Sequence, residues 1–213
     1  MKHYTVLMSI VDFVPVILFA VAAIILQCEL YRQMSKGTFA LFSVGTLDII
    51  CAGGAKALYK LLYAAGICDF KPLSDMFFPV QSLGFMFAGI GMLAMILHRP
   101  GKDAALSVVP PVFTGTMVFV SCMCLGQALV YVVLCILCVK LKKPFLIAVF
   151  VTSFLCSLTM GYLSTKDFAQ SYMNWIAEIT NIIGQGLLLY GVAAMKKDGL
   201  SGLKIREKGN NTA

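Results

Sequence analysis

The chain has 213 residues and a formal net charge of +7, and 60% of its residues are hydrophobic while only 13% are charged. Soluble globular domains carry about 25% charged residues, so this composition argues against a soluble enzyme or binding domain. The basic residues lie between apolar runs and near the C-terminus, as they do in the loops of membrane proteins. No cluster of Lys or Arg interleaved with aromatic residues indicates nucleic-acid binding. We therefore expect a lipid bilayer, and no nucleic acid, as a partner.

Three long stretches contain no charged residue at all, namely residues 13–28, 76–97 and 104–139. About 20 apolar residues in a helix cross the roughly 30 Å hydrocarbon core of a bilayer. A soluble helical protein would instead need polar faces that repeat every 3.6 residues, and most of these stretches lack one. The sequence predicts an all-α fold, a polytopic integral membrane helix bundle with about six transmembrane helices.

The first half of the chain predicts three spans, at residues 5–27, 38–60 and 76–97. The first span resembles a signal peptide at its start, but its apolar run continues to Leu26 and no soluble domain follows, so we expect it to be retained. In the second span, Gly53 and Gly54 allow a kink and the close approach of a neighbouring helix.

The second half predicts three further spans, at residues 113–139, 144–163 and 171–195. The first of these is a single span because the stretch 104–139 contains no polar turn that could divide it. We predict that residues 1–197 form one transmembrane domain and that residues 198–213 form a basic, disordered cytoplasmic tail.

Orientation follows from the placement of Lys and Arg, which are enriched on the cytoplasmic side of membrane proteins. Six alternating spans place both termini on one side. That side would hold most of the basic residues, including those of the tail and Lys2, Lys71, Lys140, Lys142 and Lys143. The sequence thus predicts a plasma (inner) membrane protein with both termini in the cytoplasm.

The two halves of the chain are weakly alike, which raises the hypothesis of an internal repeat. Four residues of the third span match four of the sixth at one constant offset: Met76, Phe78, Gln81 and Gly89 against Met173, Trp175, Glu178 and Gly186. If successive spans cross the membrane in alternating directions, two repeats of three spans each enter the membrane from opposite faces. This predicts a 3+3 inverted repeat, an architecture common among transporters; the other interpretation is chance similarity between apolar helices.

Polar side chains inside the predicted spans are the candidate functional residues, because ionisable groups there are costly and usually face the bundle interior. In the sixth span, four polar residues follow one another at intervals of 4, 3 and 4 residues. They therefore share one helix face about 16 Å long. Gln127 could join the same interior, and Lys60 is expected to snorkel to the interface. The candidate substrate- or ion-binding residues are Asp12, Asp48, Lys56, Gln81, Asn174, Glu178, Asn181 and Gln185.

Two interpretations of these polar residues stay open. They either line a polar pathway or midplane site, or they form an internal network that holds the helices together. The first predicts a transporter or channel for a small-molecule solute, in which Glu178 or Asp48 could couple transport to protons. The alternative is a membrane sensor or accessory subunit that assembles with a membrane-protein partner or as a homo-oligomer.

An intramembrane lipid-modifying enzyme is a third hypothesis, and it requires Asp12, Asp48 and Glu178 to lie near one membrane face. The predicted spans put these carboxylates at different depths instead. The chain has no HExxH or GxSxG motif. Cys135 and Cys138 form a CxxC pattern with no His nearby, which we interpret as helix packing. We expect no metal or organic cofactor, and enzyme function is disfavoured.

Overall fold

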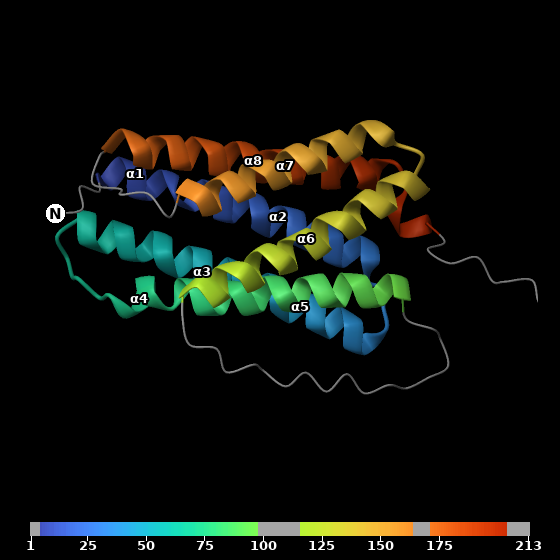
Figure 1. Cartoon of the computed structure of the whole chain (residues 1–213), viewed down its shortest axis with the longest axis horizontal. Coiled ribbons are helices and arrows are strands. Elements are labelled where there is room, and N and C mark those ends of the chain that lie inside the picture. Colours follow the sequence, from blue (N-terminus) through green and yellow to red (C-terminus); the bar gives the residue numbers. More distant parts are fainter. Residues whose placement is uncertain (1–4, 98–115, 164–170, 204–213) are drawn as a thin grey trace, which may run out of the picture.

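The computed structural model describes residues 5–97, 116–163 and 171–203, and Figure 1 shows its helices lying side by side along one long axis. Six helical stretches of the described chain are long and apolar enough to cross a membrane. They confirm the predicted all-α bundle, and the chain is a multi-pass integral membrane protein. The helices are α1 Val6–Val11, α2 Phe13–Leu30, α3 Lys36–Ala64, α4 Pro72–Asp75, α5 Phe77–Leu97, α6 Thr116–Lys140, α7 Pro144–Leu163 and α8 Ser171–Lys197.

Proline interrupts the first span and thereby places a carboxylate at the break. Pro15 has no N–H to offer the carbonyl of Val11, four residues earlier, and the helix is interrupted at Asp12, between α1 and α2. Upstream, the Thr5 hydroxyl caps α1 by accepting a hydrogen bond from the Met8 backbone N–H at 3.3 Å. Asp12 therefore lies at the joint of two helices, and its side chain is buried.

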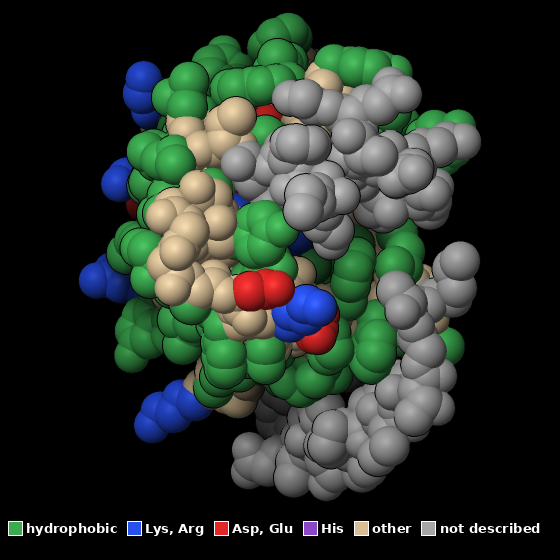
Figure 2. Space-filling model, turned by 90° about the vertical axis from the view of Figure 1, so that its left-hand side faces the viewer, with side chains coloured by type: hydrophobic (Ala, Val, Ile, Leu, Met, Phe, Trp, Pro, Cys, Tyr) green, Lys and Arg blue, Asp and Glu red, His purple; other side chains and the backbone are tan. Residues whose placement is uncertain are grey.

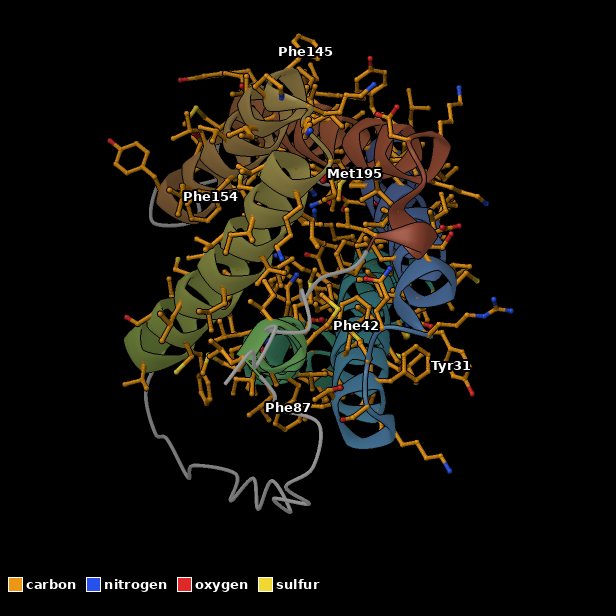
Figure 3. All side chains as sticks on the ribbon, turned by 90° about the vertical axis from the view of Figure 1, so that its right-hand side faces the viewer. Tyr31, Phe42, Phe87, Phe145, Phe154 and Met195 are labelled. Atoms are coloured by element: carbon orange, nitrogen blue, oxygen red, sulfur yellow. The ribbon has the colours of Figure 1, made fainter. Side chains whose placement is uncertain are left out.

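The six long helices form a closed ring. Each packs against the next along the chain, and α8 completes the circle by packing against α2. Figure 3 shows this ring end-on, with Tyr31 and Phe145 pointing outward and Met195 inward. Because side chains from every helix reach the middle of the ring, polar residues far apart in the sequence meet there.

Small residues bring α3, α5 and α6 into backbone contact. A Cβ atom added at Gly45 would lie 2.4 Å from the Ala88 nitrogen and 2.5 Å from the Gly84 oxygen. One added at Gly126 would lie 2.4 Å from the carbonyl carbon of Phe85. Membrane helices approach each other this closely only where their interfaces carry small residues. The sequence suggested Gly53–Gly54 for such an approach. A Cβ added at Gly53 would lie 3.1 Å from a methyl group of Val16 on α2, whereas one added at Gly54 would have nothing within 4 Å.

An apolar core fills the half of the bundle in which α2 ends and α3 begins. Its fully buried members come from all six long helices and the turn after α8, and they include Leu30, Phe42, Met92, Leu137, Phe150, Met195 and Leu200. On the other side of this core, toward the start of α1, the interior is polar. The bundle is thus divided along its length into a packed half and a polar half.

The helix directions differ from the alternation expected from the sequence. The Ser153 hydroxyl donates to the Gly184 carbonyl at 2.7 Å, and Gly191 lies against Phe150, so α7 and α8 are antiparallel. In contrast, α5 and α6 are parallel, because Gly126 meets Phe85 while Leu129, one turn later, meets Gly89. Figure 1 shows both helices running in the same direction.

The parallel pair departs from the alternation of spans on which two predictions rest. Both termini were expected on one face because six alternating spans return the chain to its starting side, whereas the described helices α5 and α6 run in the same direction. The start of α1 and the end of α8 lie at opposite ends of the bundle (Figure 1). For the same reason the halves α2–α3–α5 and α6–α7–α8 run in matching directions, so any repeat relating them is parallel and not inverted. The connection between α5 and α6, residues 98–115, lies outside the described residues.

The start of the predicted tail packs on the bundle. After α8, a 3₁₀ turn at Leu200–Gly202 buries Leu200 completely. The Gln33 side-chain amide donates to the Leu200 carbonyl at 2.6 Å, and Lys143 pairs with Asp198 at 2.8 Å. These contacts fasten the end of α8 to the α2–α3 and α6–α7 connections. The rest of the predicted tail, 204–213, lies outside the described residues.

Candidate functional site

A cavity of about 380 Å³ occupies the polar half of the ring. All six long helices contribute to its wall, together with Ser74 of α4. Its charged and amide side chains are Asp12, Lys56, Lys60, Gln81, Gln127, Asn174, Glu178, Asn181 and Gln185. Hydrocarbon cannot satisfy such groups, so the ring encloses them and keeps them from the acyl chains.

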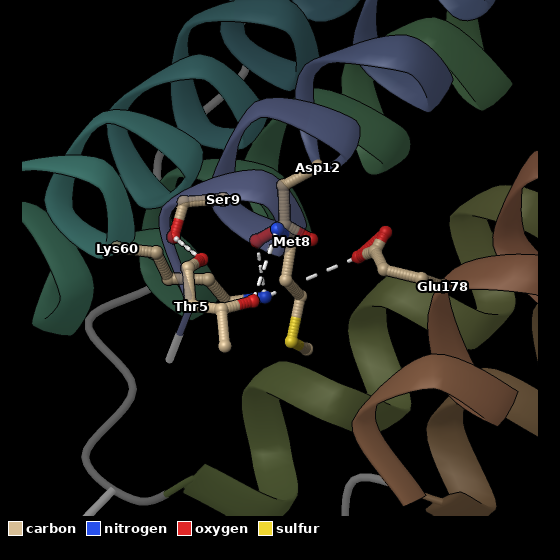
Figure 4. Close-up of polar contacts among 6 residues, drawn as sticks. All are labelled: Thr5, Met8, Ser9, Asp12, Lys60 and Glu178. Carbon is tan, nitrogen blue, oxygen red and sulfur yellow. Dashed lines mark hydrogen bonds and ion pairs between the residues drawn. The ribbon is translucent and has the colours of Figure 1, made fainter. Parts of the chain in front are cut away.

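The centre of the charge network is Lys60, whose ammonium group lies between two carboxylates (Figure 4). It forms an ion pair with Asp12, and its Nζ is 3.9 Å from Oε1 of Glu178. The Asp12 and Glu178 side chains are only 6% and 7% exposed. A buried carboxylate needs a compensating charge, and here one cation from α3 serves a carboxylate from the α1–α2 joint and another from α8.

The second lysine, Lys56, lies one helical turn before Lys60 on α3 and packs against aromatic rings of α5. Its Nζ is 3.8 Å from the centre of the Phe77 ring and 5.8 Å from that of Phe78. The negative face of an aromatic ring attracts a cation at these distances. Lys56 is therefore held at the cavity wall by ring contacts near the start of α5.

Apart from Oδ2 of Asp12, which is ion-paired with Lys60, three oxygen atoms of the cavity wall are buried and have no hydrogen-bond partner among the described residues. They are Oε1 of Gln81, Oε2 of Glu178 and Oε1 of Gln185. A buried polar atom without a partner costs about 1–3 kcal/mol. The unsatisfied positions come from α5 and α8, on two sides of the ring, and all three are hydrogen-bond acceptors.

The cavity gathers seven of the eight residues proposed from the sequence. The face of α8 that carries Asn174, Glu178, Asn181 and Gln185 lines it along its length. Asp12, Lys56 and Gln81 join this face from α1–α2, α3 and α5. Residues from four parts of the chain therefore meet in the cavity and form the predicted polar interior.

Asp48 is the predicted residue that lies elsewhere. It is beside Gly84 at the α3–α5 contact and does not line the cavity. Lys60, which was expected to snorkel to the interface, instead holds the two buried carboxylates. The signal for Lys60 was present in the sequence, because it follows Lys56 by four residues on the same helix face.

Comparison with known proteins adds no relative: no protein-family model, no curated protein and no solved structure matches the chain.

Proposed function

We propose that this protein transports a small solute across the membrane through the centre of its six-helix ring. The observation that carries the proposal is the cavity lined by charged and amide side chains, to which every long helix contributes and which contains buried acceptors without partners among the described residues. Transporter binding sites lie between membrane helices near the middle of the bilayer, and polar groups inside spans mark such pathways.

The division of the bundle supports a transporter more than an open channel. The polar cavity occupies one half, and the other half is closed by buried apolar side chains such as Leu30, Met92 and Leu137. A channel needs a continuous path, whereas a transporter closes one side of its site while the other is accessible. In this proposal, the apolar half opens when the cavity half closes.

In a proton-coupled transporter of this structure, Glu178 is the residue that would bind and release the proton. Asp48 does not line the cavity, and Asp12 is bound to Lys60. Glu178 faces Lys60 on one side, and on the other it has an oxygen without a hydrogen-bond partner in the described chain. The other charged groups of the cavity wall are Asp12 at the α1–α2 joint and Lys56 and Lys60 of α3.

Replacing Glu178 tests the proposal directly. In proteoliposomes, osmotic swelling followed by light scattering reports the entry of neutral and zwitterionic solutes, and of cations or anions when an ionophore carries the compensating charge, so the assay works while the substrate is unidentified. Glu178→Gln keeps the side-chain shape but loses a charge-assisted bond, so we expect the rate for the transported solute to fall about tenfold. Any response of that rate to a proton gradient should disappear in the same variant.

The matched control is Thr180→Val, on the same helix but outside the cavity wall, where the Thr180 hydroxyl bonds only to the Ile176 carbonyl among the described groups. It should transport like the unmodified protein. Absence of swelling with every neutral, cationic, anionic and zwitterionic solute tested would contradict transport and favour a sensor or accessory subunit, which binds without flux.

The membrane orientation belongs to the same proposal. At the end of the bundle where α2, α6 and α8 finish, the described chain carries seven basic residues: Arg32, Lys36, Lys140, Lys142, Lys143, Lys196 and Lys197. The opposite end, apart from the lysines of the cavity, carries Lys71 beside Asp69 and Asp75. Figure 2 looks onto that end, where acidic and basic side chains lie together among hydrophobic ones.

Because basic residues stay on the cytoplasmic side, we propose that the α8 end is cytoplasmic and that the α1 end faces outward. Reporter insertion tests this. An epitope after Lys142 should be protected from protease added to intact cells, and one after Lys71 should be cleaved. A tag before α1 should be exposed and one after α8 protected. Protection of both terminal tags would restore the alternating arrangement and contradict the parallel α5 and α6.

A further inference from the structure

The charges of the cavity cancel. Asp12 and Glu178 contribute two negative charges, and Lys56 and Lys60 contribute two positive ones. Lys60 lies between the carboxylates, so an added ion would face both signs at close range in a medium of low dielectric constant. An unpaired charge in such surroundings is costly, and sites selective for ions that are built from charged side chains use rings of one sign. The cavity is therefore better matched to a neutral solute than to an ion.

The buried acceptors specify what this solute must offer. The Glu178 carboxylate can only accept hydrogen bonds, and its Oε2 has no donor among the described residues. The side-chain oxygens of Gln81 and Gln185 also have no hydrogen-bond donor among the described residues. Glu178 and Gln185 are about 10 Å apart along α8. A solute that satisfies more than one of these atoms needs hydrogen-bond donors at several separated positions.

The rest of the wall is apolar and aromatic. Phe19, Phe77, Phe78 and Phe85 line the cavity from α2 and α5. Rings of this kind pack against C–H groups, and ligand sites commonly combine apolar walls with a few well-placed polar groups. A molecule with C–H faces and hydroxyl groups at its edges fits both parts of the wall. The volume, about 380 Å³, is near the lower limit of ligand pockets.

From the cancelled charge, the acceptors and the aromatic wall together, we infer that the cavity binds a small neutral solute rich in hydroxyl groups. This inference rests on the proposed transport function for its biological meaning, but binding is a separate property and is tested separately.

Equilibrium dialysis with the purified full chain in detergent supplies that test, with radiolabelled mannitol as the probe and choline and lactate as the cationic and anionic comparators. We expect saturable binding of mannitol at one site and weaker binding of either ion. Gln81→Leu and Gln185→Leu each remove an acceptor and should weaken mannitol binding about tenfold. Thr180→Val, outside the wall, should leave it unchanged. Circular dichroism and size-exclusion chromatography confirm that each variant is folded.

The two proposals fail in different ways. Preferential binding of choline or lactate, or no saturable mannitol binding to folded protein, overturns the neutral-polyol inference. If swelling assays nevertheless report flux of another solute, transport survives and only the solute class is wrong. If mannitol binds as described but no solute crosses the membrane, the inference survives and the transport function falls.

Discussion

Lys60→Met is expected to be the most damaging single substitution in the cavity, lowering the free energy of unfolding by about 3–5 kcal/mol. The ammonium group of Lys60 pairs with Asp12 and lies 3.9 Å from Glu178. Removing it leaves two buried carboxylates without their shared cation. The melting temperature in detergent micelles should fall by roughly 2–4 °C for each kcal/mol lost.

A second set of variants distinguishes charge from packing as the cause. Asp12→Asn removes one of the two carboxylates, so Lys60 keeps Glu178 as a partner and the loss should be much smaller. The triple variant Lys60→Met, Asp12→Asn, Glu178→Gln has no buried charge in this network, and its melting temperature should recover most of the way. If the triple variant is as unstable as Lys60→Met alone, the loss comes from the methylene chain of Lys60 and not from its charge.

The polar face of α8 could be predicted because its spacing keeps it on one side of the helix. From Asn174 to Gln185 the steps are 4, 3 and 4, and eleven residues at about 100° each return to within about 20° of the starting direction. That face lines the cavity as the pattern indicated. The helix limits were also readable, because long apolar runs ended by Lys, Arg or Pro leave few alternatives.

The same arithmetic explains why Asp48 was misplaced. Asp48, Lys56 and Lys60 follow one another at multiples of four residues along α3, but each step of four drifts by about 40°. Over the twelve residues to Lys60 the drift reaches about 120°, so Asp48 points toward α5 while Lys60 points into the ring. A run of i, i+4 spacings marks one face over two turns, and over four turns it winds around the helix.

The directions of the helices could not be read from hydropathy, which reports the length of a span and not the end at which it begins. The assumption of alternation therefore determined both the orientation and the inverted repeat. The parallel packing of α5 and α6 depends on where Gly126 meets Phe85 and Leu129 meets Gly89. Such contacts can be identified only in the three-dimensional structure, because many small residues along both helices could have formed them equally well.

Gly45→Ala should lower stability by about 1–3 kcal/mol, although alanine is the better helix former. The added Cβ would lie 2.4 Å from the Ala88 nitrogen and 2.5 Å from the Gly84 oxygen, both backbone atoms that cannot rotate away. Relief requires α3 and α5 to separate. The matched control is Gly54→Ala on the same helix, where nothing lies within 4 Å and stability should rise by about 0.5–1 kcal/mol.

The separation of α3 from α5 would also reach the cavity, since Lys56 and Lys60 lie on one of these helices and Gln81 and Phe85 on the other. We therefore expect Gly45→Ala to weaken solute binding as well as stability, whereas Gly54→Ala should affect neither adversely. Melting temperatures and dialysis of the two variants, measured side by side, give both readouts. If the two alanine variants have equal melting temperatures and equal solute binding, α3 and α5 are not in backbone contact, and the arrangement of the helices in the ring is wrong.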